Sequence, residues 1–294
     1  MISKELIKKV RRIQIRTRHR VSDHFSGHYH SVFKGQGMEF HEVREYVPGD
    51  DIRSIDWNVT ARMGHPYVKK FVEERELTVL LLVDISASHT FGSTPQRKQD
   101  LAAELAALLA FSATINNDRV GLLLFSDEVE HYLPPRKGSG HVLRLVRDVL
   151  SFTPRRTGTA LRPALDFLNH VMPRRAVTFL ISDFIFNEEL RKPLAMTARR
   201  HDLISVLVGD KREQAWPRAG LVEWVDAESG ERYWVDTSDR RTRRQLAHMQ
   251  LAQRKMTLEE LRRSGIDHIE VYAGEEYERE LLRFFRMREQ RLRM

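Results

Sequence analysis

From residue 77 onward, the chain repeats short segments in which nearly every residue is apolar. These segments are Leu77–Val83, Val120–Phe125, Ala176–Ile181, Leu203–Val208 and Ile266–Tyr272. Runs of this length are typical of parallel strands that are buried on both faces of a sheet. Helices are predicted between them, at Arg97–Thr114, Val142–Leu150, Leu161–Val171, Glu188–Arg200 and Arg240–Arg263. The alternation predicts an α/β fold with a doubly wound, mostly parallel sheet and helices on both of its faces.

Two segments are predicted to depart from this alternation. Val129–Leu133 follows the preceding strand too closely for a crossover helix, which predicts an antiparallel strand at the edge of the sheet. Leu221–Val235 alternates around Glu228-Ser-Gly230, which predicts a hairpin inserted at about residues 220–236.

The N-terminal part of the chain has a different character. Leu6, Val10 and Ile13 recur at helical spacing, which predicts a basic amphipathic helix over about residues 3–20 and then a polar linker. Turns such as Pro48-Gly49-Asp50-Asp51 divide the following segment into short pieces. We therefore expect the helix and linker at residues 1–33, a turn-rich module at 34–75 and the sheet domain at 76–294.

The amino-acid composition excludes several kinds of site and several classes of protein. Cysteine is absent, which excludes disulfides, thiolate zinc sites, iron–sulfur clusters and cysteine nucleophiles, and suits a reducing compartment. The longest apolar stretches, Leu77–Val83 and Leu105–Phe111, are well short of the roughly 18 residues of a membrane span. Charged residues occupy the start of the chain, where a signal peptide would be apolar. We therefore expect a cytoplasmic protein without a membrane span.

The net charge of +8 comes largely from the two ends of the chain. The candidate partner-binding residues of the N-terminal helix are Lys8, Lys9, Arg11, Arg12 and Arg16. Such a stripe, expected to lie outside the sheet domain, can contact phosphates, acidic lipids or an acidic protein face, or can simply be a solvated helix face. The first 24 residues lack the interleaved aromatic residues of a single-strand nucleic-acid binder.

Oxygen-bearing side chains follow two of the predicted strands and precede one predicted helix. Asp84, Ser86 and Ser88 come at a spacing of two just after the first strand, Thr159 precedes the helix at Leu161, and Asp183 follows the third strand. All three loops are expected at one sheet edge, where open α/β sheets bind ligands. Hydroxyl and carboxylate oxygens are the ligands that Mg²⁺ prefers. Taken singly, these serines could instead cap a turn.

Together, these five positions resemble the complete metal-ion-dependent adhesion site of von Willebrand factor A domains. The stretch from Gly35 to Arg62 further resembles the signature of a bacterial von Willebrand-like family, domain-of-unknown-function family 58. The resemblance implies a Rossmann-like fold that binds Mg²⁺ or Mn²⁺ and an association with MoxR-type AAA+ ATPases. Thr157 is a rival for Thr159, but Thr159 fits the family spacing better. His89 departs from the family pattern, and we expect a loop histidine there.

The function predicted from these features is non-enzymatic. An enzyme needs a nucleophile or general base beside the metal, and the proposed ligands supply neither without releasing the ion. We expect a metal-dependent protein-interaction module, an adaptor of a MoxR-type AAA+ ATPase in assembly or remodelling of a client, with no small-molecule substrate. An acidic side chain of the partner would complete the metal sphere. The alternatives are nucleic-acid binding through the basic helix and tail, and a metal-dependent hydrolase.

Overall fold

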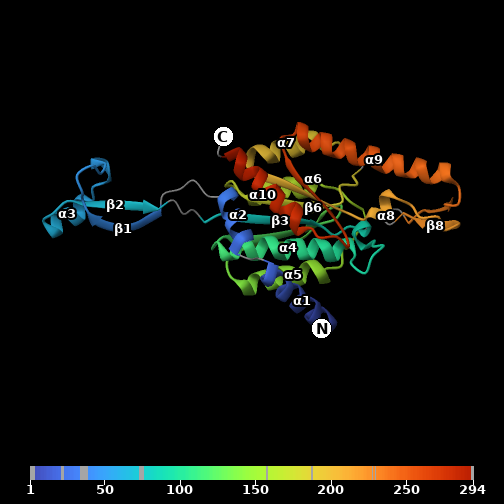
Figure 1. The fold of residues 1–294 in the computed structure, drawn as a ribbon, viewed down its shortest axis with the longest axis horizontal. Helices are drawn as coiled ribbons and strands as arrows, with labels where there is room; N and C mark the ends of the chain where they lie inside the picture. The colour runs from blue at the N-terminus through green and yellow to red at the C-terminus, as the bar shows by residue number, and fades with distance from the viewer. Residues whose placement is uncertain are drawn as a thin grey trace. The chain divides into compact units, whose positions relative to one another are not determined.

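The computed structural model describes residues 4–20, 23–33, 39–72, 76–156, 158–186, 188–226, 228 and 230–292. The chain divides into two compact units, one formed by Met1–Val32 together with Thr78–Met294 and the other by Phe33–Leu77. Figure 1 shows the elements of both units. Among the described residues, no helix is long and apolar enough to cross a membrane.

The larger unit is built on a six-stranded sheet with the order β10-β7-β6-β3-β4-β5. The strands are β3 (Thr78–Asp84), β4 (Arg119–Phe125), β5 (Val129–Arg136), β6 (Val177–Ser182), β7 (Asp202–Gly209) and β10 (Asp267–Tyr272). All neighbouring strands are parallel except β5, which pairs antiparallel with β4 at one edge. This confirms the predicted fold class, including the antiparallel edge strand. Pro134 and Pro135 lie near the end of that edge strand.

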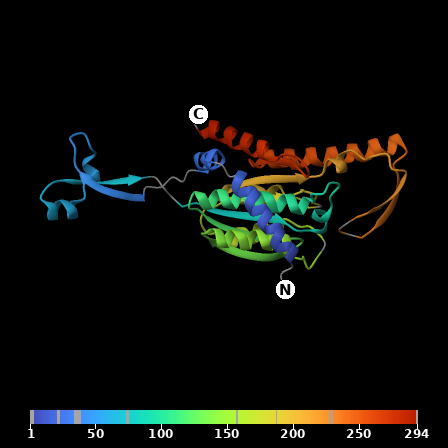
Figure 2. The ribbon, with the colours of Figure 1, turned by 60° about the horizontal axis from the view of Figure 1, so that its bottom comes forward.

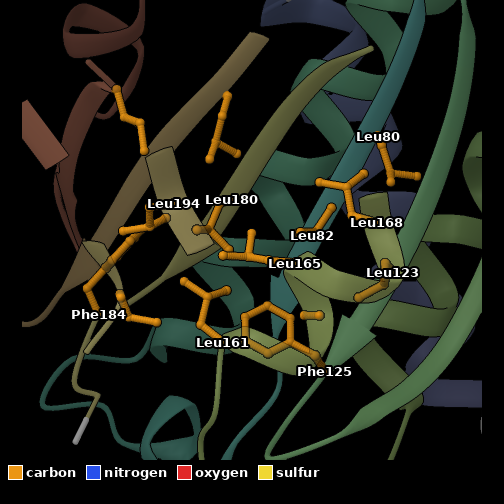
Figure 3. Packing of buried hydrophobic residues seen from close by; sticks show 14 of the residues in the cluster. Leu80, Leu82, Leu123, Phe125, Leu161, Leu165, Leu168, Leu180, Phe184 and Leu194 are labelled. Atoms are coloured by element: carbon orange, nitrogen blue, oxygen red, sulfur yellow. The ribbon is translucent and has the colours of Figure 1, made fainter. Parts of the chain in front are cut away.

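The central strand β3 is buried on both faces because helices cover both sides of the sheet. Leu80 and Leu82 point into a cluster with residues of α6 (Arg162–Val171) and α7 (Arg191–Arg200), as Figure 3 shows. Val79 to Val83 are all fully buried. Burying an apolar side chain of this size stabilises the folded state by roughly 1.5–3 kcal/mol. Because every position of the strand is buried, every position favours an apolar residue.

Helix α4 (Lys98–Ile115) covers the opposite face of the sheet and is buried nearly all round. Six alanines, at positions 102, 103, 106, 107, 110 and 113, allow neighbouring elements to approach it closely. Helix α5 (Ser139–Ser151) lies beside α4 and contacts β4, and α1 (Lys4–Arg20) packs across both helices (Figure 2). The expectation that the basic helix lies outside the sheet domain is therefore wrong, because its apolar residue Ile13 is buried in this unit.

A second helix, α2 (Asp23–Phe33), occupies part of the segment that we expected to be a linker. Tyr29 of this helix is completely buried, and its hydroxyl donates to Asp118 Oδ2 at 3.3 Å. Its ring meets Phe285 edge to face at 6.2 Å. Phe285 belongs to α10 (Glu278–Leu292), a segment for which we predicted only a basic tail. Tertiary burial of apolar side chains, rather than local propensity, makes α2 helical, whereas α10 is rich in the strong helix formers Glu, Leu and Arg.

Replacing Tyr29 with alanine should destabilise the fold by about 3–5 kcal/mol, because it empties a fully buried aromatic site. Burial raises the pKa of Tyr29 well above its usual 10.0, and the charge of Asp118 raises it further. The stability that this shift provides is present below pH 10.0 and is lost as the pH rises through the folded-state pKa. Urea unfolding followed by circular dichroism measures both effects. Tyr29→Phe serves as the control: it keeps the ring, costs only about 1 kcal/mol and loses this alkaline instability.

The remaining elements of the larger unit follow β7. They are α8 (Lys211–Gln214), β8 (Leu221–Val225), β9 (Arg232–Asp236) and α9 (Arg240–Arg263). Strands β8 and β9 pair antiparallel, which confirms the predicted hairpin. Most of the hairpin's side chains are exposed, including Trp234 at 67%.

The smaller unit contains an antiparallel pair, β1 (Glu39–Glu45) and β2 (Tyr67–Val72), with η1 (Ile52–Ser54) and α3 (Trp57–Met63) between them. Its acidic residues hold the unit's own turns. Asp50 binds Arg44 through two hydrogen bonds of 2.7 and 2.8 Å, and Asp56 caps α3 through the N–H groups of Asn58 and Val59. These charged residues therefore serve the internal structure of the smaller unit.

Candidate metal site

The candidate site lies where the chain changes direction across the sheet. Strand β3 has β4 on one side and β6 on the other, so the chain moves outward to β4 and β5 and then returns to β6. The carboxyl ends of β3 and β6 are adjacent at this switch point, the usual ligand-binding position of open α/β sheets. Asp84 ends β3, and Asp183 directly follows β6.

Asp84 is held by hydrogen bonds from both strands. Its Oδ1 accepts from the backbone N–H of Ser86 at 2.9 Å, and its Oδ2 accepts from the hydroxyl of Ser182 at 2.7 Å. The residue is only 1% exposed. Burial raises the pKa of this carboxyl, although the nearby His89 acts in the opposite direction. The protein therefore leaves the negative charge of Asp84 incompletely compensated.

Ser86 and Ser88 lie beside this carboxylate, as their spacing predicted. Their hydroxyl oxygens are 3.1 Å apart. A hydrogen bond from Ser88 also helps to lower the pKa of Asp183, which connects the β3 loop to the β6 loop. The structure thus brings Asp84, Ser86, Ser88 and Asp183 together.

Asp183 forms a buried ion pair with Lys98, the first residue of α4. The Lys98 ammonium lies 2.9 Å from Asp183 Oδ2 and 2.7 Å from Glu213 Oε1. Burial opposes ionisation of Asp183, but the Lys98 charge and further interactions outweigh it and lower its pKa. Burial likewise disfavours the charged form of Lys98, and its two carboxylate partners reverse the effect, so that its pKa is raised.

His89 is a buried neighbour of the carboxylates rather than the loop histidine that we expected. It lies in η2 (Ala87–Thr90), is 1% exposed, and neither ring nitrogen has a hydrogen-bond partner. Its Nε2 is 3.6 Å from Asp84 Oδ2. One donor atom from each of Asp84, His89 and Asp183 lies within 4.8 Å of the others. A buried imidazole without a partner is costly, and a bound cation would supply one.

Thr159 contributes from the loop before α6, and its partner comes from the hairpin. Its hydroxyl donates to Oε1 of Glu228 at the hairpin tip. Glu228 is half-buried and is within electrostatic range of both Asp183 and Asp84. This bond joins the loop before α6 to the hairpin. The rival residue Thr157 lies outside the described residues.

These donors fit a hard divalent cation. The five predicted residues supply carboxylate and hydroxyl oxygens, which Mg²⁺ and Mn²⁺ prefer, and the imidazole of His89 adds a donor that suits Mn²⁺ better than Mg²⁺. Lys98 supplies one positive charge against Asp183 and Glu213, while Asp84 and Glu228 add further negative charge. A divalent cation held by Asp84, Ser86, Ser88, Thr159 and Asp183 would offset this excess.

Sequence reasoning missed Lys98, Glu213 and Glu228. Lys98 carried a usable signal, because a cation in the first turn of a helix opposes the helix dipole and so needs a specific anionic partner. Glu213 sits in a four-residue helix capped by Asp210, which also binds Ser93. No spacing rule connects Glu228 to residue 159.

The basic residues of α1 divide into two groups. Lys9 pairs with Asp100 and Arg16 pairs with Glu104 at 3.3 Å, so both attach α1 to α4. Lys8, Arg11 and Arg12 are exposed on the outer surface. Near the C-terminus, Arg288 forms ion pairs with Asp202 and Asp267, and Arg291 forms one with Asp267.

The larger unit is therefore a doubly wound α/β domain with oxygen donors at the switch point of its mostly parallel sheet. The family described as protein of unknown function DUF58 matches residues 42–256, and the chain belongs to this family.

An uncharacterized protein of Mycobacterium tuberculosis is 33% identical over 228 residues, which cover 77% of this chain and 72% of the relative. Two solved structures are also similar. BatB from Bacteroides thetaiotaomicron is 12% identical and covers 73% of this chain and 99% of its own, with a TM-score of 0.47. The SpRpn10 VWA domain is 11% identical over 71% of this chain and 94% of its own, with a TM-score of 0.40.

Proposed function

We propose that this protein binds a divalent cation, Mg²⁺ or Mn²⁺, at the carboxyl end of β3 and uses the cation to capture an acidic side chain of a partner protein. The observation that carries the proposal is the convergence of Asp84, Ser86, Ser88 and Asp183 at the switch point, with the buried imidazole of His89 3.6 Å from Asp84. Hydroxyl ligands are neutral, so a cation held partly by them keeps positive charge toward solvent. A carboxylate is the side chain that such a cation binds best.

The donor arrangement supports binding rather than catalysis. A general base must reach a substrate proton, and His89 is only 1% exposed. The oxygens of Asp84 are engaged by Ser86 and Ser182, and Asp183 is engaged by Lys98. We therefore propose a non-enzymatic role without a small-molecule substrate.

The family resemblance supports a MoxR-type AAA+ ATPase as the partner, with the protein serving as an adaptor in assembly or remodelling of a client. With an ATPase as its partner, the protein would act as an adaptor in the cytoplasm, where ATP is available. The exposed residues Lys8, Arg11 and Arg12 would then accelerate encounter with an acidic face. Nucleic-acid binding is less favoured, because Lys9, Arg16, Arg288 and Arg291 are already paired within the fold.

The test measures binding of a MoxR-type ATPase from the same organism by surface kinetics, with Mn²⁺ or with chelator. Wild type should bind in Mn²⁺ and lose at least about tenfold in affinity in chelator, because each tenfold change requires only about 1.4 kcal/mol. The Ser86→Ala, Ser88→Ala double variant should bind weakly under both conditions.

A Ser151→Ala, Ser238→Ala variant provides the matched control, since both of these serines are exposed and neither is a candidate metal ligand. It should behave as wild type. If the affinity is unchanged by chelator but falls steeply with salt, the result would instead support electrostatic binding through the basic residues of α1, as in nucleic-acid recognition. Turnover of a phosphoester or peptide by the metal-loaded protein would support the hydrolase alternative.

A further inference from the structure

His89 comes from the same loop as three of the predicted metal ligands. The 3₁₀ turn η2 follows Ser86, and the backbone N–H of His89 donates to the carbonyl of Ser86 at 3.1 Å. Residues three apart lie on the same side of such a turn. The ring of His89 lies beside the carboxylate of Asp84, with 3.6 Å between Nε2 and Oδ2. The loop therefore brings a nitrogen donor as well as oxygen donors to the end of β3.

The imidazole of His89 is buried without a hydrogen bond. The residue is 1% exposed, and neither Nδ1 nor Nε2 has a hydrogen-bond partner. A buried polar group that makes no hydrogen bond costs about 1–3 kcal/mol, and nearly all such groups in folded proteins are paired. Coordination of a cation by one ring nitrogen would give that nitrogen a partner.

The distance between His89 and Asp84 is longer than a histidine–carboxylate hydrogen bond. Such a bond occurs elsewhere in the fold, where Nε2 of His131 lies 3.2 Å from Oδ2 of Asp148. Two donors that are each about 2.1 Å from one octahedral ion are about 3.0 Å apart when adjacent and about 4.2 Å apart when opposite. The 3.6 Å between His89 and Asp84 lies in this range, so it fits two atoms that share a cation.

Asp183 adds a second carboxylate to this pair. One donor atom from each of Asp84, His89 and Asp183 lies within 4.8 Å of the others. The chemistry of the three donors is mixed, because carboxylates suit Mg²⁺ and Mn²⁺, whereas an imidazole suits transition metals. A nitrogen donor therefore changes which cation the site favours.

We propose that His89 is a direct nitrogen ligand of the cation held by Asp84 and Asp183, and that it makes the site prefer a divalent transition metal to Mg²⁺. This inference rests on the proposed function and names the class of cation that the site takes. The affinity of the site should follow the usual order of the transition metals, in which Co²⁺ binds more tightly than Mn²⁺.

The experiment compares wild type, His89→Gln, His131→Gln and Asp84→Ala, each checked for folding by circular dichroism. His89→Gln exchanges the nitrogen donor for an amide oxygen. His131→Gln is the matched control, because it removes an imidazole that faces a carboxylate outside the cluster. Calorimetry measures the affinities for Mg²⁺ and Co²⁺. Pulsed electron paramagnetic resonance of bound Mn²⁺, in protein labelled with ¹⁵N only in histidine, detects a directly bound imidazole.

Wild type should bind Co²⁺ at least about tenfold more tightly than Mg²⁺. In His89→Gln the Co²⁺ affinity should fall at least roughly 10–100-fold, the loss typical even for partners of metal ligands. The Mg²⁺ affinity should change little, because an amide oxygen suits Mg²⁺. Bound Mn²⁺ should show coupling to a histidine nitrogen in wild type and His131→Gln, and no such coupling in His89→Gln.

The spectrum of wild type needs no substitution, so it decides the inference even where His89→Gln does not fold. Mn²⁺ bound without histidine coupling would show that His89 is not a ligand, while the metal site itself would stand. Coupling that survives in His89→Gln would overturn the inference in the same way.

The affinities separate the remaining outcomes. A rise in affinity for both metals in His89→Gln would show that the imidazole is a cationic partner of Asp84 that competes with the metal, and would overturn the inference. An equal loss of Co²⁺ affinity in His131→Gln would overturn it as well. If Asp84→Ala alone abolishes binding and His89→Gln matches wild type, only the metal site stands. If wild type binds none of the three metals, both proposals fail.

Discussion

Replacing Lys98 with methionine is expected to destabilise the metal-free protein by about 3–5 kcal/mol, the usual cost of removing one partner from a buried ion pair. The side chain of Lys98 is 1% exposed and that of its partner Asp183 is 3% exposed. Methionine fills a similar volume, so the loss reports charge rather than packing. Urea unfolding at neutral pH, in chelator, measures it.

The size of this loss should depend on pH and on metal. The lowered pKa of Asp183 provides stability that is present above its usual 3.8 and is lost as the pH falls through the folded-state value. The raised pKa of Lys98 provides stability that is present below its usual 10.5 and is lost as the pH rises through its folded-state value. The difference in the free energy of unfolding between wild type and Lys98→Met should therefore become smaller at both low and high pH. Mn²⁺ should also narrow it by supplying positive charge.

Lys192→Met is the control, since Lys192 is an exposed lysine of α7. Its effect should stay within about 0.5 kcal/mol. A loss below 1 kcal/mol for Lys98→Met would contradict the importance of the buried pair.

The second large effect is expected from Asp84→Ala, which should abolish Mn²⁺ binding and with it the stabilisation by metal. A ligand that binds only the folded state stabilises it by about 2.7 kcal/mol at a hundredfold excess over its Kd. Differential scanning calorimetry should show this as a rise in the Tm of wild type that is missing in the variant. Without metal the variant should remain folded, because the buried charge of Asp84 is disfavoured by its surroundings.

Asp166→Asn removes an exposed carboxylate of α6 that pairs with Arg162. This control should keep the full metal-dependent rise in Tm. An Asp84→Ala variant that retained Mn²⁺ binding would place the metal elsewhere and overturn the assignment of the site.

The parts of the fold that could be predicted are those in which burial makes the local sequence apolar. Strand β3 is buried on both faces, so its sequence is apolar throughout, and β5 follows β4 too closely for a crossover. Helix α2 shows no such pattern, because its sequence contains three histidines, two serines and a glycine, and its helix depends on burying Tyr29 against distant residues.

The same distinction applies to the site. Asp84, Ser86 and Ser88 come from one loop, and their spacing places them together. Glu228 meets Thr159 only because the hairpin folds back over the sheet edge, a contact between positions that no local pattern relates. The sequence marks Lys98 only as a cation in the first turn of a helix, and its pairing with Asp183 depends on where α4 begins relative to β6.

The two prolines near the end of β5 have a consequence for how molecules of this protein meet one another. An exposed edge strand offers backbone donors to any other strand, and is a common route to unwanted polymerisation. Pro134 and Pro135 have no backbone N–H to offer, so pairing of a neighbouring molecule's strand with this end of β5 is disfavoured. At high concentration, the sheets of two molecules are therefore less able to join along that margin.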